Sequence, residues 1–302
     1  MALHQGTIAG EVARYLRTGD TDVLYHAWPG GVLERAERAK VDLRGALVRE
    51  VLLRAEGRGH APIPQGDGIA LVRGKVAPMV RGLFPRAEQD VVLATLERSV
   101  VFMTAETIQA LLLHHAWDHS AWTLANLYLA GVGAELLAGD APRIVGMSVE
   151  ATCYVSPSYF VEESPFADFV VHEAAHIFHN CKRGAIGLGR TRTKEWLLDV
   201  DFVERETFAY ACEAYACVLA RANRPAERRA LAAEFARDPR LSDDSADVPK
   251  VVGIVGEAAA ARHGWKVILR RCAPTGGPRP VASHPVGPEA AGGAEPRRMC
   301  PP

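Results

Sequence analysis

Apolar positions along most of this chain recur at helical spacing, i, i+3, i+4 and i+7, and Gly and Pro separate the stretches in which they do so. This pattern predicts a helix-rich protein. The predicted helices cover residues 8–56 (interrupted at 19–20 and 28–31), 88–115, 117–137, 166–179, 204–219, 225–237, 249–262 and 265–271. A Gly/Pro-rich loop at 57–68 leads into a short β-like piece at 69–76.

One stretch follows the period of two that is typical of a β-strand. Between residues 144 and 155, apolar side chains at odd-numbered positions alternate with polar or aromatic ones at the even-numbered positions from 148 onward. The Ser-Pro-Ser sequence at 156–158 then ends the pattern. These residues predict a single strand that ends 17 positions before His172.

Segments that contain Gly and Pro divide the chain into three predicted parts. A Gly-Asp-Ala-Pro sequence at 139–142 separates the N-terminal helices from the predicted strand and marks a candidate domain boundary. We therefore predict a helical N-terminal region at 1–140 and an α+β core with a small sheet at 141–272. Residues 273–302 are rich in Pro and Gly with few large apolar residues, which predicts a disordered tail.

Composition and charge narrow the class of protein. The chain has 302 residues, is 48% hydrophobic and 24% charged, and carries a net charge of −1, as soluble globular proteins do. Lys and Arg are spread along it, so we expect no nucleic-acid partner. We see neither a signal peptide nor a long uncharged apolar stretch, and so expect no membrane span. The six cysteines are scattered without CxxC pairs, which favours reduced thiols and a cytoplasmic location.

The most informative motif is His-Glu-Ala-Ala-His at residues 172–176, inside the helix predicted at 166–179. Ser164 and Pro165 supply an N-cap and a first-turn proline for that helix. Positions i and i+4 lie on the same face of a helix, so His172 and His176 can hold one zinc ion. Glu173 would then stand beside the metal, where it can take a proton from metal-bound water. The alternative is an ordinary buried helix with hydrogen-bonded histidines.

A catalytic zinc site needs a third protein ligand. The predicted helix at 204–219 carries two carboxylates, Glu206 and Glu213, which are two turns apart and share a face with Tyr210 between them. A lone carboxylate in an apolar helix is costly to bury. One carboxylate as ligand and the other as the partner that orients a histidine N–H would account for both, and the spacing leaves their order open.

The motif and the Glu-Thr-Phe-Ala sequence that starts at Glu206 resemble the gluzincin branch of the zincin metallopeptidases, over roughly residues 143–220. The resemblance implies a zincin-like core, with an edge strand over the motif helix along which a peptide substrate pairs. It implies zinc bound by His172, His176 and Glu206, with Glu173 as the general base. No glycine follows the motif at metzincin spacing, which argues against that branch.

We therefore expect a zinc-dependent metallohydrolase that acts on peptides or proteins. The tetrahedral oxyanion needs a donor besides the metal; the candidates are Tyr210, which we name as the catalytic residue, and Tyr154, Tyr159 and His179. Two other classes remain open. The same ligands could bind iron as a facial triad and act on a non-peptide substrate, or the protein could bind partners without turnover.

A second histidine cluster could also bind metal. His115 and His119 are four residues apart, His114 precedes them, and Asp118 lies beside them. The cluster lacks the glutamate of the zincin motif and lies near a predicted helix junction. It could equally line the cleft of the first site or form polar surface.

Overall fold

The computed structural model describes residues 6–63, 68–161, 164–189, 195–241 and 246–274. The predicted tail lies outside these ranges beyond residue 274. The described helices are α1 (Ile8–Thr18), α2 (Val32–Arg54), α3 (Gly68–Leu83), α4 (Arg86–Ser99), α5 (Ala105–His114), α6 (Asp118–Gly131), α7 (Phe169–Asn180), α8 (Arg205–Arg221), α9 (Pro225–Arg237), α10 (Val248–Ala260) and α11 (Gly264–Cys272). Short 3₁₀ helices are η1 (Pro157–Val161), η2 (Arg183–Ile186) and η3 (Phe202–Glu204). Among the described residues, no helix is both long and apolar enough to cross a bilayer.

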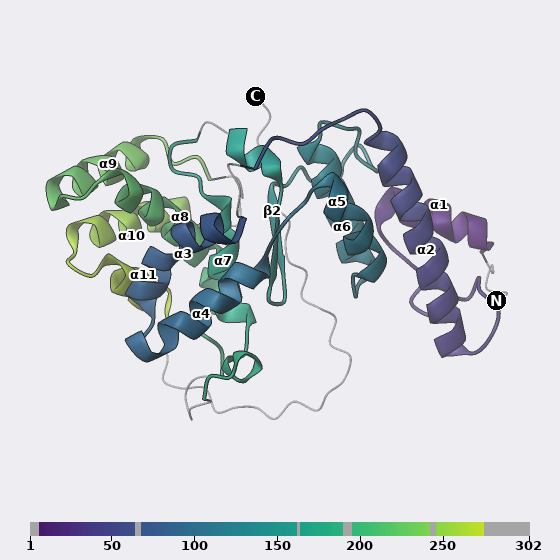
Figure 1. Ribbon diagram of the computed structural model, residues 1–302, viewed down its shortest axis with the longest axis horizontal. Coiled ribbons are helices and arrows are strands. Elements are labelled where there is room, and N and C mark those ends of the chain that lie inside the picture. The colour runs from purple at the N-terminus through teal and green to yellow at the C-terminus, as the bar shows by residue number, and fades with distance from the viewer. Residues whose placement is uncertain (1–5, 64–67, 162–163, 190–194, 242–245, 275–302) are drawn as a thin grey trace.

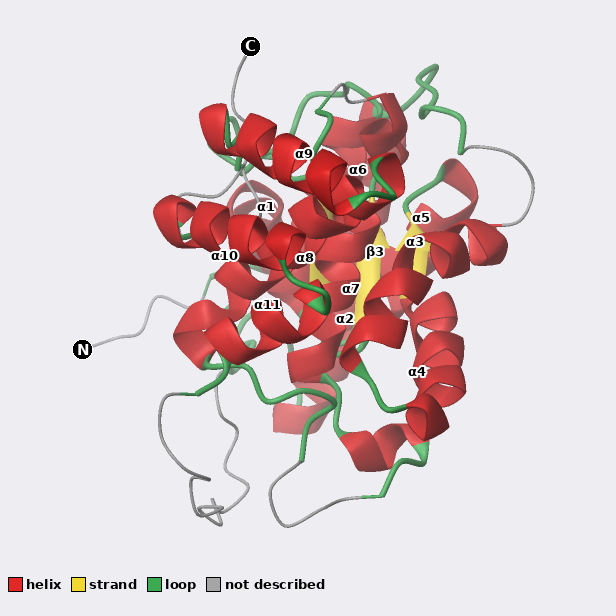
Figure 2. Ribbon diagram, turned by 90° about the vertical axis from the view of Figure 1, so that its left-hand side faces the viewer, coloured by secondary structure: helices red, strands yellow, loops and turns green. Residues whose placement is uncertain are grey.

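The strands β1 (Val100–Phe102), β2 (Gly146–Val149) and β3 (Thr152–Val155) form one small sheet in the order β1-β3-β2. β1 runs parallel to β3, and β2 runs antiparallel to it. β2 is therefore an edge strand. Figure 1 shows the sheet between α1, α2, α5 and α6 on one side and α8–α11 on the other, and Figure 2 shows how small it is among the helices. The predicted class, α+β and rich in helix, is confirmed.

The sheet separates two clusters of buried apolar side chains. Successive residues of a strand point to opposite faces, so Cys153 packs with α3, α4 and α7–α11, whereas Tyr154 packs with α1, α2, α5 and α6. α3 and α4 therefore share a core with the later helices. The predicted division of the chain at residue 140 remains a prediction, and the two buried clusters divide the helices at different points.

A close contact joins α3 and α11, the first and last helices that contribute to the cluster around Cys153. Gly82, near the end of α3, lies against the indole of Trp265 in α11, where a Cβ would stand 2.0 Å from Trp265 Cδ1. The neighbouring Lys266 donates from Nζ to the Leu83 carbonyl oxygen at 2.8 Å. Only glycine allows the two helices to approach this closely.

A buried arginine joins three helices of the cluster around Tyr154, namely α2, α5 and α6. The Arg44 side chain in α2 is 1% exposed. Its Nε donates to Asp118 Oδ1 at 2.8 Å, and its terminal nitrogens donate to the Leu112 and His115 carbonyl oxygens at 3.2 Å each. One guanidinium thus binds the end of α5 and the start of α6, and Tyr25 also donates to the Asp118 carboxylate.

Several predicted helices are confirmed, among them the three after residue 224. Several predictions in the N-terminal half are wrong. Residues 21–27, between the two predicted breaks, are not helical, so one break separates α1 from α2, and the helix predicted over 117–137 ends at Gly131. Residues 69–76 belong to α3, which buries Val72, Val76 and Val80 at helical spacing. The helix predicted over 88–115 is interrupted by β1, because its apolar residues pair with β3, about fifty positions later in sequence.

The single strand predicted over 144–155 is also wrong, since the chain reverses within it. β2 and β3 form a hairpin in which Val149 pairs with Thr152, so that Glu150 and Ala151 make a two-residue turn. Glu150 has a φ of 52°, a left-handed value that the first central residue of such turns often adopts, usually as glycine. The sequence lacks that glycine, so the turn is hidden in an alternating pattern.

Candidate metal centre

α7 carries the motif and lies between the sheet and α8, in contact with β2, β3 and α8. The predicted N-cap, Ser164, is wrong: α7 begins at Phe169, and the Asp168 side chain accepts from Val171 N at 3.2 Å. Asp168 also pairs with Lys75 Nζ at 2.5 Å. Asp168 therefore both caps α7 and ties the start of this helix to α3.

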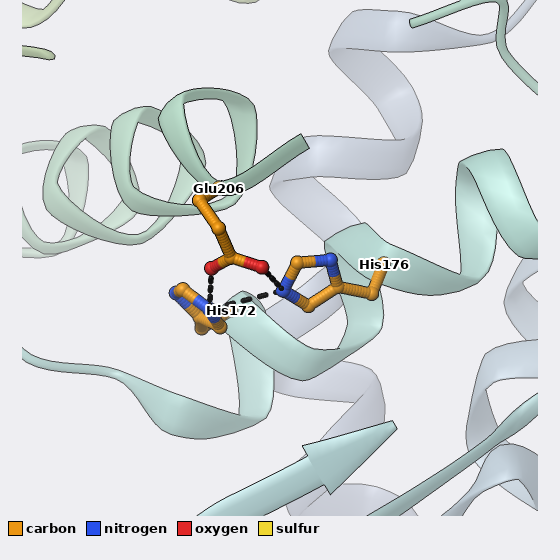
Figure 3. Close-up of side chains that lie close together, drawn as sticks. All are labelled: His172, His176 and Glu206. Atoms are coloured by element: carbon orange, nitrogen blue, oxygen red, sulfur yellow. Dashed lines mark hydrogen bonds and ion pairs between the residues drawn. The ribbon is translucent and has the colours of Figure 1, made fainter. Parts of the chain in front are cut away.

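The structure brings together His172 and His176 from α7 and Glu206 from the first turn of α8, as Figure 3 shows. The two Nε2 atoms lie 3.1 Å apart. Each is 3.5 Å from one oxygen of the Glu206 carboxylate. Within the described part of the chain, these three residues form the group of His, Cys, Asp or Glu side chains whose ligand atoms could share one ion. Its metal ligands would be two imidazoles and one carboxylate.

The outer nitrogen of each histidine is bound by another side chain. Nδ1 of His172 lies 3.1 Å from Glu213 Oε2, and the other oxygen of Glu213 accepts from Asp168 N at 2.8 Å. A carboxylate only accepts, so Nδ1 of His172 carries the proton and its Nε2 offers a lone pair. Glu213 therefore lies behind His172, whereas Glu206 faces both imidazoles.

Two successive hydrogen bonds orient the ring of His176. Its Nδ1 lies 3.0 Å from His179 Nε2, and His179 Nδ1 lies 3.1 Å from Asn180 Oδ1. Burial lowers the pKa of His179 to about 4, with Arg205 adding to the effect, so His179 is neutral near pH 7. A neutral His179 that donates to Asn180 accepts from His176, which leaves Nε2 of His176 with a lone pair.

Glu173 points from α7 toward the edge strand. Its side chain is buried at 2% exposure, and its Oε2 accepts from Ser148 Oγ at 2.6 Å. A Cβ at Gly146 would lie 2.7 Å from Glu173 Oε1, so the missing side chain makes room for the carboxylate. Residues i and i+3 are neighbours on a helix, so Glu173 also lies beside His176.

The predicted oxyanion donors are distributed over three places. The Tyr210 ring packs against His172 with centroids 4.6 Å apart and is 1% exposed. Tyr154 packs in the cluster of α1, α2, α5 and α6, away from α7. Tyr159 packs edge-on against Phe169, and burial, together with Asp168, raises its pKa. Tyr210 and His179 are therefore the two candidates that contact a motif histidine.

The second histidine cluster does not converge on one point. Asp118 is engaged by Arg44 and Tyr25, the exposed His119 stacks on Trp122, and His115 packs against Tyr154. Their separate partners favour a structural or surface role over a shared ion.

No model of a protein family matches the chain, and neither a curated protein nor a solved structure matches it. The zincin resemblance therefore remains a prediction that rests on the motif.

Three residues of this site were not predicted from the sequence: Ser148, Gly146 and Asn180. Ser148 was visible as a polar position in the strand pattern, but its partner lies 25 residues away on another element.

Proposed function

We propose that this protein is a zinc-dependent hydrolase and that its substrates are peptides. The observation that carries the proposal is the convergence of His172, His176 and Glu206, with both imidazoles turned so that Nε2 faces the carboxylate. Two imidazole lone pairs and a carboxylate that face one another, with little access to water, favour a cation between them.

The separations also suit zinc. Ligands about 2.0–2.1 Å from a tetrahedral zinc ion stand about 3.3 Å from one another. The three separations here are 3.1, 3.5 and 3.5 Å. When bound, zinc would act as a Lewis acid that lowers the pKa of water and polarises a carbonyl.

Glu173 would act first as the general base and then as the general acid. In the proposed reaction its carboxylate accepts a proton from the attacking water and returns it to the leaving amine. Ser148 holds one carboxylate oxygen at 2.6 Å, which fixes the group's orientation. The edge strand β2 beside it offers backbone groups with which an extended peptide could pair; this supports a peptide over a smaller substrate.

The first test is metal content. Purified protein should carry about one zinc per chain, measured by elemental analysis, and His176→Ala or Glu206→Ala should lose it. Glu213→Ala removes a partner that orients His172, so it should weaken zinc binding by about 10–100-fold without abolishing it. Stoichiometric zinc in His176→Ala would contradict the site. Iron in place of zinc would instead favour oxygen chemistry.

The second test separates catalysis from binding. Glu173→Gln keeps the shape of the side chain and should retain zinc. Hydrolysis of a peptide library should fall by at least about 100-fold, since general acid–base catalysis contributes typically 10²–10⁴-fold. Glu234→Gln, an equal change at a half-exposed carboxylate of α9 that pairs with Arg221, is the matched control. Full hydrolysis by zinc-loaded Glu173→Gln would overturn the proposed mechanism.

A further inference from the structure

A cavity of about 610 Å³ lies on the side of the sheet away from α7. Its walls come from β1, α5, the connection from α5 to α6, and the β2–β3 hairpin. Val149 and Tyr154 line it and belong to the cluster of α1, α2, α5 and α6, whereas Cys153, between them in the sheet, faces α7. The cavity is therefore separate from the candidate metal centre and independent of the proposed reaction.

The cavity has the size and the lining of a small-molecule site. Such sites are typically about 300–1,000 Å³, mostly apolar, with a few polar groups that fix orientation. Val101, Leu111 and Val149 supply apolar walls, and Thr152 supplies a hydroxyl group. The hydroxyl of Thr107, another lining residue, is bound to the Phe102 carbonyl and the Thr104 N–H. A ligand with an apolar body would be in contact with side chains on several sides.

Two aromatic side chains add to this lining. Trp117 is 54% exposed, although burying an indole is strongly favourable, so a ligand that covered it would gain contact area. Tyr154 packs edge-on against His115, with ring centroids 5.9 Å apart. Burial, with Arg44 and Lys40 nearby, lowers the pKa of His115 to about 4, so this imidazole adds no positive charge near pH 7.

The charge of the lining is negative. Glu106 and Glu150 are the carboxylates of the lining, both exposed at the rim, and no Lys or Arg is among the described residues that line it. Glu150 is also held at a φ of 52°, a conformation that costs free energy for a residue with a side chain. Carboxylates beside an exposed indole match a ligand cation, which both groups attract.

We propose that this cavity binds an organic cation, in which a primary ammonium group is carried on an aromatic or aliphatic stem. The stem lies against Trp117, Leu111 and Val149, and the ammonium group faces the rim carboxylates. This chemistry is shared by free amines and by the lysine side chain of a peptide, and the experiment distinguishes the two.

The test uses three indoles that differ mainly in charge. Tryptamine, neutral tryptophol and anionic indole-3-acetate are titrated into ¹⁵N-labelled protein, and the indole N–H signal of Trp117 is followed by NMR after its assignment with Trp117→Phe. Tryptamine should bind saturably with a Kd of about 1 mM, as expected for a ligand of its size. Tryptophol should bind about two- to fivefold more weakly, and indole-3-acetate more weakly still. N-acetyl-lysine amide forms the peptide arm of the experiment.

Variants locate the binding. Glu150→Gln and Glu106→Gln should each weaken tryptamine binding by about two- to fivefold, and Trp117→Ala should weaken it by about tenfold. Glu234→Gln, on α9 across the sheet, should leave the Kd unchanged. Binding by N-acetyl-lysine amide alone would support the same site with a peptide as its ligand. Equal affinity for tryptophol and tryptamine, or no shift of the Trp117 signal by either cation, would overturn the proposal.

Discussion

Gly146 leaves room for the carboxylate of Glu173 against the edge strand. A Cβ at this position would lie 2.7 Å from Oε1 and 2.9 Å from Cγ of Glu173. The Glu173 side chain is 2% exposed and bound to Ser148, so it has little space in which to move aside. One glycine thus positions the residue that we propose as the general base.

We predict that Gly146→Ala displaces the Glu173 carboxylate and lowers kcat of peptide hydrolysis by about 10–100-fold, because misplacement by about 1 Å can cost 10²-fold. The zinc content should remain near one per chain. Steady-state kinetics and elemental analysis measure the two. Gly139→Ala is the control, since nothing lies within 4 Å of a Cβ there. Unchanged kcat in zinc-loaded Gly146→Ala would contradict this role.

The residues of the candidate site were predictable where local geometry decides. His172 and His176 lie together because four residues make about one helical turn. Glu206 was favoured over Glu213 only through the family resemblance, and the structure brings it to the imidazoles. The contacts of Ser148 and Gly146 with Glu173 could not be read from the sequence, because they depend on how α7 packs on the sheet.

At the scale of elements, the sequence predicted helices well where turns are marked by Gly and Pro. It failed at α3, whose valines have high β-propensity. The packing of Val72, Val76 and Val80 in the core outweighs that local preference. It failed again at β1 and at the hairpin, because strand pairing joins residues far apart and the turn at Glu150 lacks glycine.

The contact between α2 and the α5–α6 connection provides a test of stability. Arg44→Ala would remove the donor to Asp118 Oδ1 and to two backbone carbonyls, while Tyr25 would still donate to Asp118 Oδ2. We expect the free energy of unfolding, measured with urea, to fall by about 3–5 kcal/mol. Arg49→Ala, an exposed change on the same helix, should cost less than about 0.5 kcal/mol. Equal losses in the two variants would show that the Arg44 contacts do not stabilise the fold.

At the scale of the whole molecule, the candidate metal ligands belong to only one of the two buried clusters. α7 and α8 pack with α3, α4 and α9–α11, and the sheet stands between them and the other helices. An ion shared by α7 and α8 would therefore stabilise that half of the molecule most directly.

We predict that removing the metal with a chelator lowers the Tm and reduces hydrogen-exchange protection mainly in α7 and α8. A ligand present at 1,000 times its Kd stabilises the native state by about 4 kcal/mol, so the shift should be readily measured. Protection in α2 and α6 should change less. Restoring zinc should reverse both effects; a Tm that does not respond to either treatment would contradict a bound metal.

The Lys266–Leu83 contact joins residues 183 positions apart, and this has a consequence for synthesis on the ribosome. The hydrogen bonds of Arg44 span 68 to 74 positions, so the helices around it can assemble while later segments are still being translated. α3 and α4 emerge early but cannot complete their packing until α11 has been made. During this interval their apolar faces are the part of the nascent chain to which a chaperone would bind.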